Sequence, residues 1–134
     1  MSGLVLKLAP NERVLINGAV IENGDRRSKI AIRTPNANVL RLKDAIHPDR
    51  ATTPVARACY IAQLILSGDA EPAEGRQQLQ RAIAQLVQVF DDPPARDVLR
   101  DAAGNAENGA IYPALRRLRE LLPLEEQLLR SRRQ

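Results

Sequence analysis

Six basic side chains in the first third of the chain have types and spacings suited to binding phosphate groups: Arg26, Arg27, Lys29, Arg33, Arg41 and Lys43. Arg26 and Arg27 come just past an expected hairpin tip. Lys29 and Arg33 share the solvent-exposed face of one expected strand, and Arg41 and Lys43 share the outward face of another. Guanidinium groups bind phosphates through paired hydrogen bonds, and a strand repeats every ~6.6 Å per two residues, near the phosphate spacing of an extended single strand. The sequence therefore predicts a phosphate-binding track, with the alternative that these side chains only solvate an exposed sheet face.

The net charge of +4 is concentrated in the same part of the chain. Residues 1–50 contain nine Lys or Arg and five Asp or Glu, whereas residues 51–134 contain eleven of each. Uneven basic charge is typical of a protein that binds a polyanion. Tyr60, Phe90 and Tyr112 all fall in helical segments, so the strands lack an aromatic platform on which bases could stack. We therefore expect a nucleic acid to be recognised through protein backbone groups, through stacking on the planar guanidinium groups of arginines, and through its shape.

The sequence lacks the motifs of common enzyme classes. It contains neither a phosphate-cradling Gly-rich loop nor a nucleophile elbow. His47 is the only histidine, and we interpret it as a polar residue at a strand-to-helix junction. Cys59 is the only cysteine, and its helical spacing favours a core position over a reactive thiol. A lone cysteine also excludes an internal disulfide and a thiolate metal cage.

Two pairs of adjacent carboxylates, Asp91-Asp92 and Glu125-Glu126, are the remaining candidates for acid–base chemistry. Adjacent helical side chains do not converge on one substrate atom. We therefore expect both pairs to be solvated surface. The sequence predicts a protein that is not an enzyme and that has no cofactor and no metal site.

Five short antiparallel strands are expected to position the basic residues. Apolar and polar residues alternate with period two over residues 4–8, 14–16, 19–22, 28–33 and 39–42. Asn17-Gly18 and Asn23-Gly24 are both strong turn signals, and Asn-Gly favours a two-residue hairpin with positive φ at both positions. The second, third and fourth strands are therefore predicted to form a meander. Such a sheet has one apolar face and open edges, so it must be covered.

Helices are predicted to supply the cover. Thr53-Pro54 starts a helix that ends at Gly68, and Pro93-Pro94 separates the next two helices. The expected ranges are 54–67, 72–90, 94–103 with Gly104-Asn105 as its stop, 110–122 and 124–129. The fold class is thus α+β, a small five-strand N-terminal sheet followed by a four- to five-helix C-terminal part. We expect a β subdomain at 1–48, the candidate RNA-binding part, and a helical subdomain at 51–134 that covers the sheet and mediates association.

The chain resembles the FlbT family in the run from Asn17 to Gly24 followed by Arg26-Arg27, in Leu42-Lys43-Asp44 and in the helix start Ala51-Thr52-Thr53-Pro54. The resemblance covers most of the chain. It implies a post-transcriptional regulator of flagellin synthesis that associates with the 5′ untranslated region of flagellin mRNA. In the best-known members of this family the protein promotes decay of that message, whereas some relatives act positively alongside a small helical partner, FlaF.

A fainter resemblance, to the carbon storage regulator proteins, covers residues 4–46. Its order is a first strand, Ile16-Asn17-Gly18, a basic hairpin, Ile30-Ala31-Ile32 and a last strand. That family binds mRNA leaders through basic residues at the ends of its first and last strands. Lys43 falls at the matching position of the last strand, whereas Leu8 and Ala9 depart from the pattern in the first. The resemblance implies a shared strand arrangement more than a shared RNA site.

Two functions follow as expectations. The first is a regulator that binds the flagellin mRNA leader and promotes its decay or blocks its translation. The second is a protein-interaction factor that binds flagellin, FlaF or another assembly factor and affects mRNA indirectly. Open sheet edges favour a homodimer. No apolar run approaches the ~20 residues that span a bilayer, and residues 1–7 do not resemble a signal peptide, so we expect a cytoplasmic protein without a membrane partner.

Overall fold

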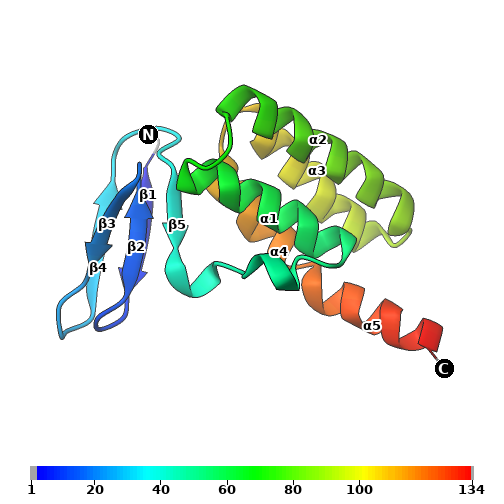
Figure 1. Ribbon diagram of the computed structural model, residues 1–134, viewed down its shortest axis with the longest axis horizontal. Coiled ribbons are helices and arrows are strands. Elements are labelled where there is room, and N and C mark those ends of the chain that lie inside the picture. The colour runs from blue at the N-terminus through cyan, green and yellow to red at the C-terminus, as the bar shows by residue number, and fades with distance from the viewer. Residues whose placement is uncertain (1–2, 134) are drawn as a thin grey trace.

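The computed structural model describes residues 3–133, and it consists of five strands followed by five helices (Figure 1). The strands are β1 (Leu4–Leu8), β2 (Arg13–Ile16), β3 (Ala19–Glu22), β4 (Ser28–Ile32) and β5 (Val39–Arg41). Two single-turn 3-10 helices, Leu42–Asp44 and Pro48–Arg50, lead from β5 to the helices. The helices are α1 (Pro54–Ser67), α2 (Pro72–Val89), α3 (Pro93–Glu107), α4 (Ile111–Arg119) and α5 (Leu122–Arg133). The predicted α+β fold, strands first and helices second, is confirmed.

The strands form two antiparallel sheets, one with the order β1-β4 and the other with the order β3-β2-β5. The predicted meander is therefore wrong, because β4 pairs with β1 from Leu4↔Ile32 to Leu8↔Ser28 and leaves β3 at an edge. The predicted β2–β3 hairpin is confirmed. Asn17 and Gly18 have φ values of 49° and 85°, as the two-residue turn between these strands requires.

Asn23-Gly24 does not make the second hairpin, because the side chain of Asn23 has another role. Its amide donates to the carbonyl oxygens of Ala9 at 2.8 Å and Arg26 at 2.9 Å, and its oxygen accepts from the Ser28 hydroxyl at 2.7 Å. These bonds join the β1–β2 connection to the start of β4. The chain is thereby carried from β3 across to β1, and one expected sheet becomes two.

The last strand is shorter than predicted. It ends at Arg41, and Leu42–Asp44 turns away as a 3-10 helix. The expectation that Arg41 and Lys43 share one strand face is therefore wrong. Lys43 is exposed on the turn, whereas the side chain of Arg41 is largely buried.

Most helix boundaries follow from the predicted caps. Thr53 caps α1, whose end at Gly68 has a φ of 84°. Three helices differ. The predicted ranges 110–122 and 124–129 are observed as Ile111–Arg119 and Leu122–Arg133. The helix α3 passes through Gly104 and ends only at Glu107. Ala102 and Ala106 are fully buried on its inner face, so packing outweighs the helix-breaking tendency of Gly104-Asn105. Pro113 lies in the first turn of α4, as predicted.

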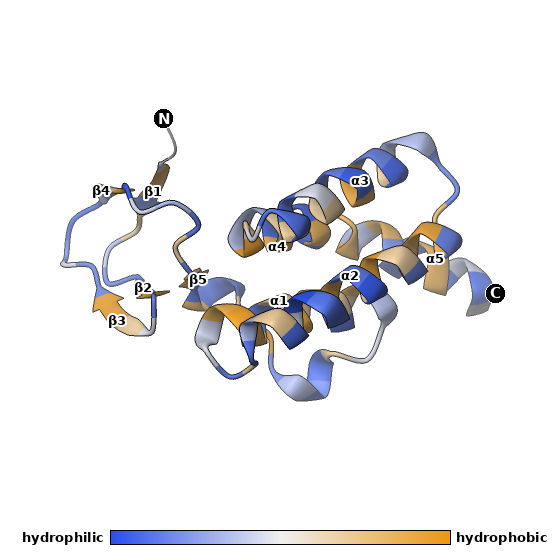
Figure 2. Ribbon diagram, turned by 90° about the horizontal axis from the view of Figure 1, so that it is seen from above, coloured by the Kyte–Doolittle hydropathy of each residue, from blue (hydrophilic) through white to orange (hydrophobic). Residues whose placement is uncertain are grey.

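A continuous apolar core joins the two sheets to the helices. Leu6, Leu8 and Val14 contribute from the strands, and α1 lies against β5 with Val55 and Cys59 buried. Cys59 is therefore a core residue, as predicted. Figure 2 shows the apolar residues of the helices turned largely toward one another, whereas the apolar strand β3 lies at the periphery. No helix within residues 3–133 is long and apolar enough to cross a membrane.

One predicted surface residue is instead buried. Glu125 on α5 is 6% exposed, and its carboxylate accepts hydrogen bonds from the Thr53 hydroxyl at 2.5 Å and the Val55 amide at 2.8 Å. It thus caps α1 from the far end of the chain. The prediction of solvation is correct for its neighbour Glu126, which is exposed and pairs with Arg130 at 2.7 Å.

Candidate nucleic-acid interface

An open hollow of about 420 Å³ lies where β1, β4 and the end of β5 come together. Its charged lining comprises Lys7, Arg27, Lys29, Arg41 and Lys43. Leu8, Ala9 and Ser28 complete the lining, so the hollow combines cationic side chains with a small apolar surface. We call it the strand hollow. It gathers four of the six basic residues predicted from the sequence.

The strand pairing brings two of these cations together. In the β1–β4 register Lys7 lies directly opposite Lys29, and both side chains are exposed. Directly opposed residues of an antiparallel pair have Cβ atoms ~5 Å apart, where like charges repel and destabilise the pair. A bound phosphate between the two ammonium groups would relieve that repulsion. The Lys7–Lys29 pair is therefore the feature of the hollow that most favours an anion.

Lys7 was not predicted as a site residue. The sequence signal was present, because Lys7 stands between the buried Leu6 and Leu8 and must point outward. Its partner could not be deduced from the expected meander, in which β4 pairs with β3. The β1–β4 register places Lys7 beside Lys29 in the strand hollow.

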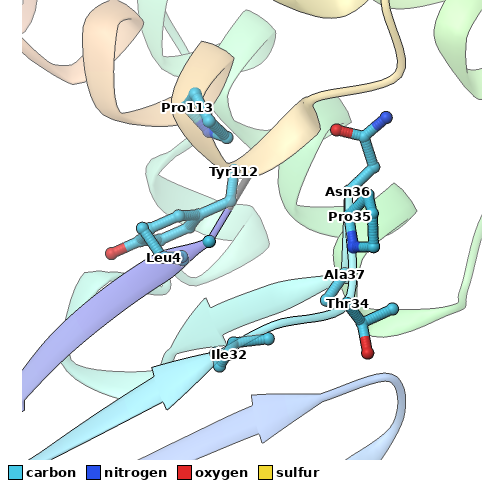
Figure 3. A pocket seen from close by; sticks show the side chains of 9 residues that line it. Leu4, Ile32, Thr34, Pro35, Asn36, Ala37, Tyr112 and Pro113 are labelled. Atoms are coloured by element: carbon cyan, nitrogen blue, oxygen red, sulfur yellow. The ribbon is translucent and has the colours of Figure 1, made fainter. Parts of the chain in front are cut away.

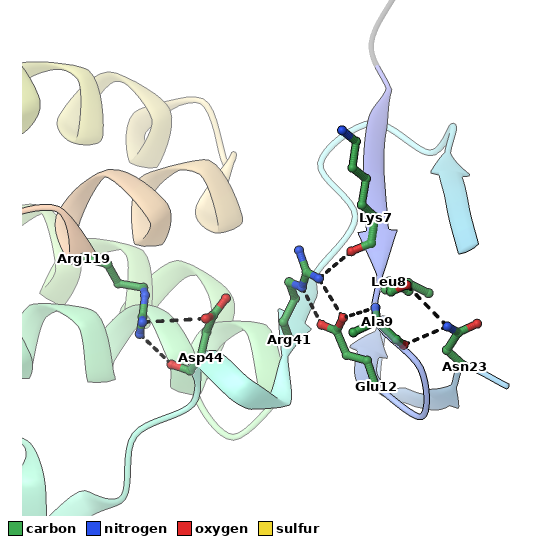
Figure 4. Close-up of polar contacts among 8 residues, drawn as sticks. All are labelled: Lys7, Leu8, Ala9, Glu12, Asn23, Arg41, Asp44 and Arg119. Carbon is green, nitrogen blue, oxygen red and sulfur yellow. Dashed lines mark hydrogen bonds and ion pairs between the residues drawn. The ribbon is translucent and has the colours of Figure 1, made fainter. Parts of the chain in front are cut away.

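Arg41 forms the floor of the hollow and is not a free cation (Figure 4). Its guanidinium donates to both carboxylate oxygens of Glu12, at 2.6 and 2.8 Å, and to the carbonyl oxygen of Lys7 at 2.6 Å. Glu12 also accepts from the Ala9 amide at 2.9 Å, and its side chain is 6% exposed. Arg41 and Glu12 thus hold the backbone of residues 7–9 in place.

The electrostatics of this pair follow from its hydrogen bonds. The bonds from Arg41 and the Ala9 amide, with the charges of Arg41 and Lys43, lower the pKa of Glu12 from 4.5 to about 2 against the opposing effect of burial. The Glu12 carboxylate in turn raises the pKa of Arg41. Both groups are charged at neutral pH and neutralise each other. The surplus positive charge of the hollow comes from its other four cations.

Those four cations have no ionic partner in the part of the chain that the structure describes. Lys7, Arg27, Lys29 and Lys43 form no ion pair there, whereas eight other basic residues do: Arg13, Arg41, His47 (when protonated), Arg96, Arg100, Arg117, Arg119 and Arg130. Several exposed arginines elsewhere, among them Arg26, Arg33 and Arg81, form no ion pair with a described residue either, so the hollow is distinguished by how closely its unpaired cations are clustered. The strand hollow is therefore where unpaired positive charge accumulates on one surface.

The other two predicted residues lie outside the hollow. Arg26 is exposed in the β3–β4 connection, where its carbonyl oxygen accepts from Asn23. Arg33 is exposed just past β4, at the end opposite to Ser28. Arg26 is the chain neighbour of Arg27, which lines the hollow, and Arg33 follows the strand β4 that carries Lys29. The predicted track is thus a cluster at one end of the strands.

A second, smaller cavity of about 170 Å³ lies where β1 and β4 meet α4 (Figure 3). Its walls are mostly apolar and include Leu4, Ile32 and Pro35, with the buried Tyr112 beside them. The amide of Asn36 donates to the Asn108 carbonyl oxygen at 3.1 Å, so its polar group is already engaged. This cavity joins the strands to the helices and offers no cluster of charged groups.

The residues interpreted from the sequence as non-catalytic include His47, Cys59 and Asp92, and each has contacts or burial typical of a structural role. His47 is exposed, and its Nδ1 accepts from the Asp49 amide at 3.1 Å at the start of the second 3-10 helix. Burial raises the pKa of Cys59 to about 12, which keeps its thiol protonated at neutral pH. Asp92 caps α3 by accepting from the Ala95 amide at 3.1 Å. Across residues 3–133, no group of three His, Cys, Asp or Glu side chains is placed to hold a metal ion.

Comparison with known proteins gives consistent matches along nearly the whole chain. The family model described as Flagellar protein FlbT matches residues 4–129. A flagellum biosynthesis repressor protein FlbT from Caulobacter vibrioides is 33% identical over 130 residues, with 94% of this chain and 89% of the relative covered. Probable flagellum biosynthesis repressor proteins FlbT from Rhodopseudomonas palustris and Mesorhizobium japonicum are 34% and 32% identical over 126 residues each, covering 94% of this chain and 97% and 84% of the relatives. No solved structure matches the chain significantly.

Proposed function

The chain belongs to the FlbT family, and we propose that it regulates flagellum biosynthesis by binding the 5′ untranslated region of flagellin mRNA in the strand hollow. The observation that carries the proposal is the cluster of four unpaired cations, with Lys7 and Lys29 held opposite each other across β1 and β4. Relatives named as flagellum biosynthesis repressors support the biological role. The cationic surface supports a nucleic-acid ligand.

The hollow suits the backbone of a single strand more than a rigid duplex groove. Its cations are set around the half-buried Ala9, whose small apolar surface can contact a ribose or the edge of a base. It has no aromatic side chain on which bases could stack. Affinity then depends on phosphate contacts, and Arg41 and Glu12 contribute by holding in place the backbone that carries Lys7.

The effect on the message is indirect in this proposal. The cluster contains cations and one neutralised carboxylate, and none of these groups is arranged as a general acid–base pair. Binding therefore acts by exposing the message to a nuclease or by blocking its ribosome-binding segment. In either case the outcome depends on how long the leader remains bound.

Charge reversal tests the proposal directly. We expect Lys29→Glu with Lys43→Glu to weaken binding of a labelled flagellin leader by at least about tenfold at low salt, because each removed phosphate contact also removes counterion release. The slope of log affinity against log salt is expected to fall by about 1.4 for two lost contacts to a single strand. Arg81→Glu with Arg132→Glu, at exposed positions of α2 and α5 away from the strands, is the control matched in net charge. Equal affinities and slopes for all three proteins would refute the site.

A second candidate function, association with flagellin, FlaF or another assembly factor, is favoured by the β3 edge. All four residues of β3 are exposed, including Val20 at 64%, and the outer backbone edge of this strand pairs with no other strand of residues 3–133. Open apolar edges bind extended segments of other chains or of a second copy. Capture of FlaF or flagellin that survives nuclease treatment would favour this function over RNA binding.

A further inference from the structure

A second open hollow, of about 470 Å³, adjoins the strand hollow and crosses onto the helical part of the molecule. Its lining includes Val5 and Lys7 from β1, Lys43 from the 3-10 turn, and Tyr112 and Arg116 from α4. Lys7, Arg41 and Lys43 line both hollows. The cationic surface therefore continues from the strands to α4, and we call this extension the helix hollow.

The acidic groups at this surface are already neutralised. Asp44 lines the helix hollow, but its carboxylate lies 3.7 Å from the Arg119 guanidinium, which also donates to the Asp44 carbonyl oxygen at 2.9 Å (Figure 4). Glu12 is likewise paired with Arg41. An entering phosphate therefore meets no unpaired carboxylate at the junction of the two hollows.

Arg116 differs from the other cations of α4. Arg117 pairs with Asp101 at 2.9 Å and with Glu120 at 2.8 Å, and Arg119 pairs with Asp44. Arg116 is exposed and forms no ion pair with any described residue. It is thus the cation of this helix that remains available to a ligand.

The side chain of Arg116 lies over an aromatic ring. Its guanidinium carbon lies 5.9 Å from the centroid of the Tyr112 ring, which is only 3% exposed. A cation at this distance is attracted by the face of the ring. The buried ring supports the guanidinium from the protein side and leaves its outer side free to accept a phosphate or to stack on a base.

We propose that the RNA strand bound in the strand hollow continues past Lys7 and Lys43 into the helix hollow, where Arg116 binds the next part of its backbone. The inference rests on the proposed RNA binding and adds a contact from the helical part of the chain. The Arg119–Asp44 contact holds α4 against the 3-10 turn, so the two hollows keep a fixed relation. RNA binding then spans both halves of the molecule.

The length of the RNA separates this inference from the function on which it rests. We compare single-stranded leader fragments of about 4 and about 12 nucleotides, a short and a long length within the range of footprints of small single-strand binding domains. Arg116→Glu is expected to weaken binding of the longer fragment about fivefold and to leave the shorter one unchanged, because only the longer strand reaches α4. Lys29→Glu should weaken binding of both, and Arg81→Glu neither.

Each outcome decides a different point. Unchanged affinity of Arg116→Glu for the longer fragment, with loss in Lys29→Glu, would overturn the helix hollow and leave the strand hollow intact. Failure of the unaltered protein to bind either fragment would overturn both proposals. Arg116→Lys retains the charge without the planar group, and we expect it to recover at least half of the lost binding free energy. Far-ultraviolet circular dichroism of each variant excludes misfolding as the cause.

Discussion

Lys7 and Lys29 lie opposite each other on the outward face of β1 and β4, an arrangement that favours a ligand over stability. Like charges at directly opposed positions weaken a strand pair, whereas a Lys beside an apolar or neutral residue does not. Nearby acids do not offset this repulsion, because Glu12 is already bound to Arg41. The pair is consistent with a site whose stability increases when a polyanion binds.

Replacement of Lys29 by Gln should therefore stabilise the free protein. We expect the free energy of unfolding to rise by about 0.5 kcal/mol at low salt, since the repulsion with Lys7 is removed. The difference should shrink in 1 M salt, where the Debye length is about 3 Å. Urea unfolding at two salt concentrations measures both quantities. A destabilised Lys29→Gln protein would show that this lysine has a structural role instead.

Glu12 links the stability of the fold to pH. Its pKa is about 2 in the folded protein and 4.5 ordinarily, so the folded state favours the charged form. This contribution is fully present above pH 4.5 and is lost as the pH falls toward 2. We expect Glu12→Gln to lower the free energy of unfolding at pH 7 by about 2 kcal/mol, the size of a lost hydrogen bond to a charged group.

The variant should also lose less stability than the unaltered protein between pH 4.5 and 2. Unfolding measured across that range provides the test. Parallel pH profiles for the two proteins would mean that Glu12 does not have the lowered pKa that its contacts with Arg41 and Ala9 imply.

At the scale of elements, local sequence signals predicted most helices and the first hairpin. Thr53-Pro54, Gly68 and Asn17-Gly18 act through their own backbone conformation, so a single sequence suffices to recognise them. Asn23-Gly24 and Gly104 misled the prediction because their roles depend on distant partners. Asn23 bonds to the β1–β2 connection, and Ala102 and Ala106, two residues before and after Gly104, are buried in the core. Pairing and packing over long separations decided both cases.

In the candidate site, too, local sequence signals could be recognised, whereas features that depend on tertiary contacts could not. The basic residues and their compositional bias could be identified from the sequence, and four of the six lie in the strand hollow. Lys7 and Arg116 could not, because the first depends on the β1–β4 register and the second on the position of α4 beside β1. The neutralisation of Arg41 by Glu12 also depends on tertiary contacts.

The attachment of α5 depends strongly on one carboxylate. Glu125 accepts from the Thr53 hydroxyl and the Val55 amide, and thereby satisfies the start of α1. We expect Glu125→Ala to destabilise the protein by about 2 kcal/mol, because a buried amide loses its acceptor. Hydrogen exchange of the Val55 amide should accelerate together with the amides of α5.

Glu126→Ala is the matched control for this prediction. Its carboxylate is exposed and pairs only with Arg130 within residues 3–133, so the expected change is within about 0.5 kcal/mol. Equal effects of the two substitutions would contradict the capping role of Glu125.

The whole molecule places its cationic and its apolar exposed features on different elements. The strand and helix hollows lie around β1, β4, the 3-10 turn and α4, whereas the apolar edge is β3 (Figure 1). This separation allows one copy to bind RNA while β3 pairs with another chain. We propose that the other chain is a second copy, which gives a homodimer.

Disruption of the β3 edge tests the dimer. We expect the double substitution Val20→Lys and Ile21→Lys to convert a dimer into a monomer, because two added charges per strand oppose edge-to-edge pairing. Sedimentation equilibrium reports the mass of each protein. A monomeric unaltered protein, or a dimer that survives the substitutions, would contradict pairing through β3.

Crosslinking of the unaltered protein to flagellin leader RNA, with identification of the attached peptides, tests the central claim most directly. The account predicts crosslinks in peptides containing Lys7, Arg27 to Lys29, and Lys43, with Arg116 added when the RNA is long enough to cross onto α4. Crosslinks confined to α2, α3 or α5, or the absence of any crosslink under conditions where the leader remains intact, would contradict it.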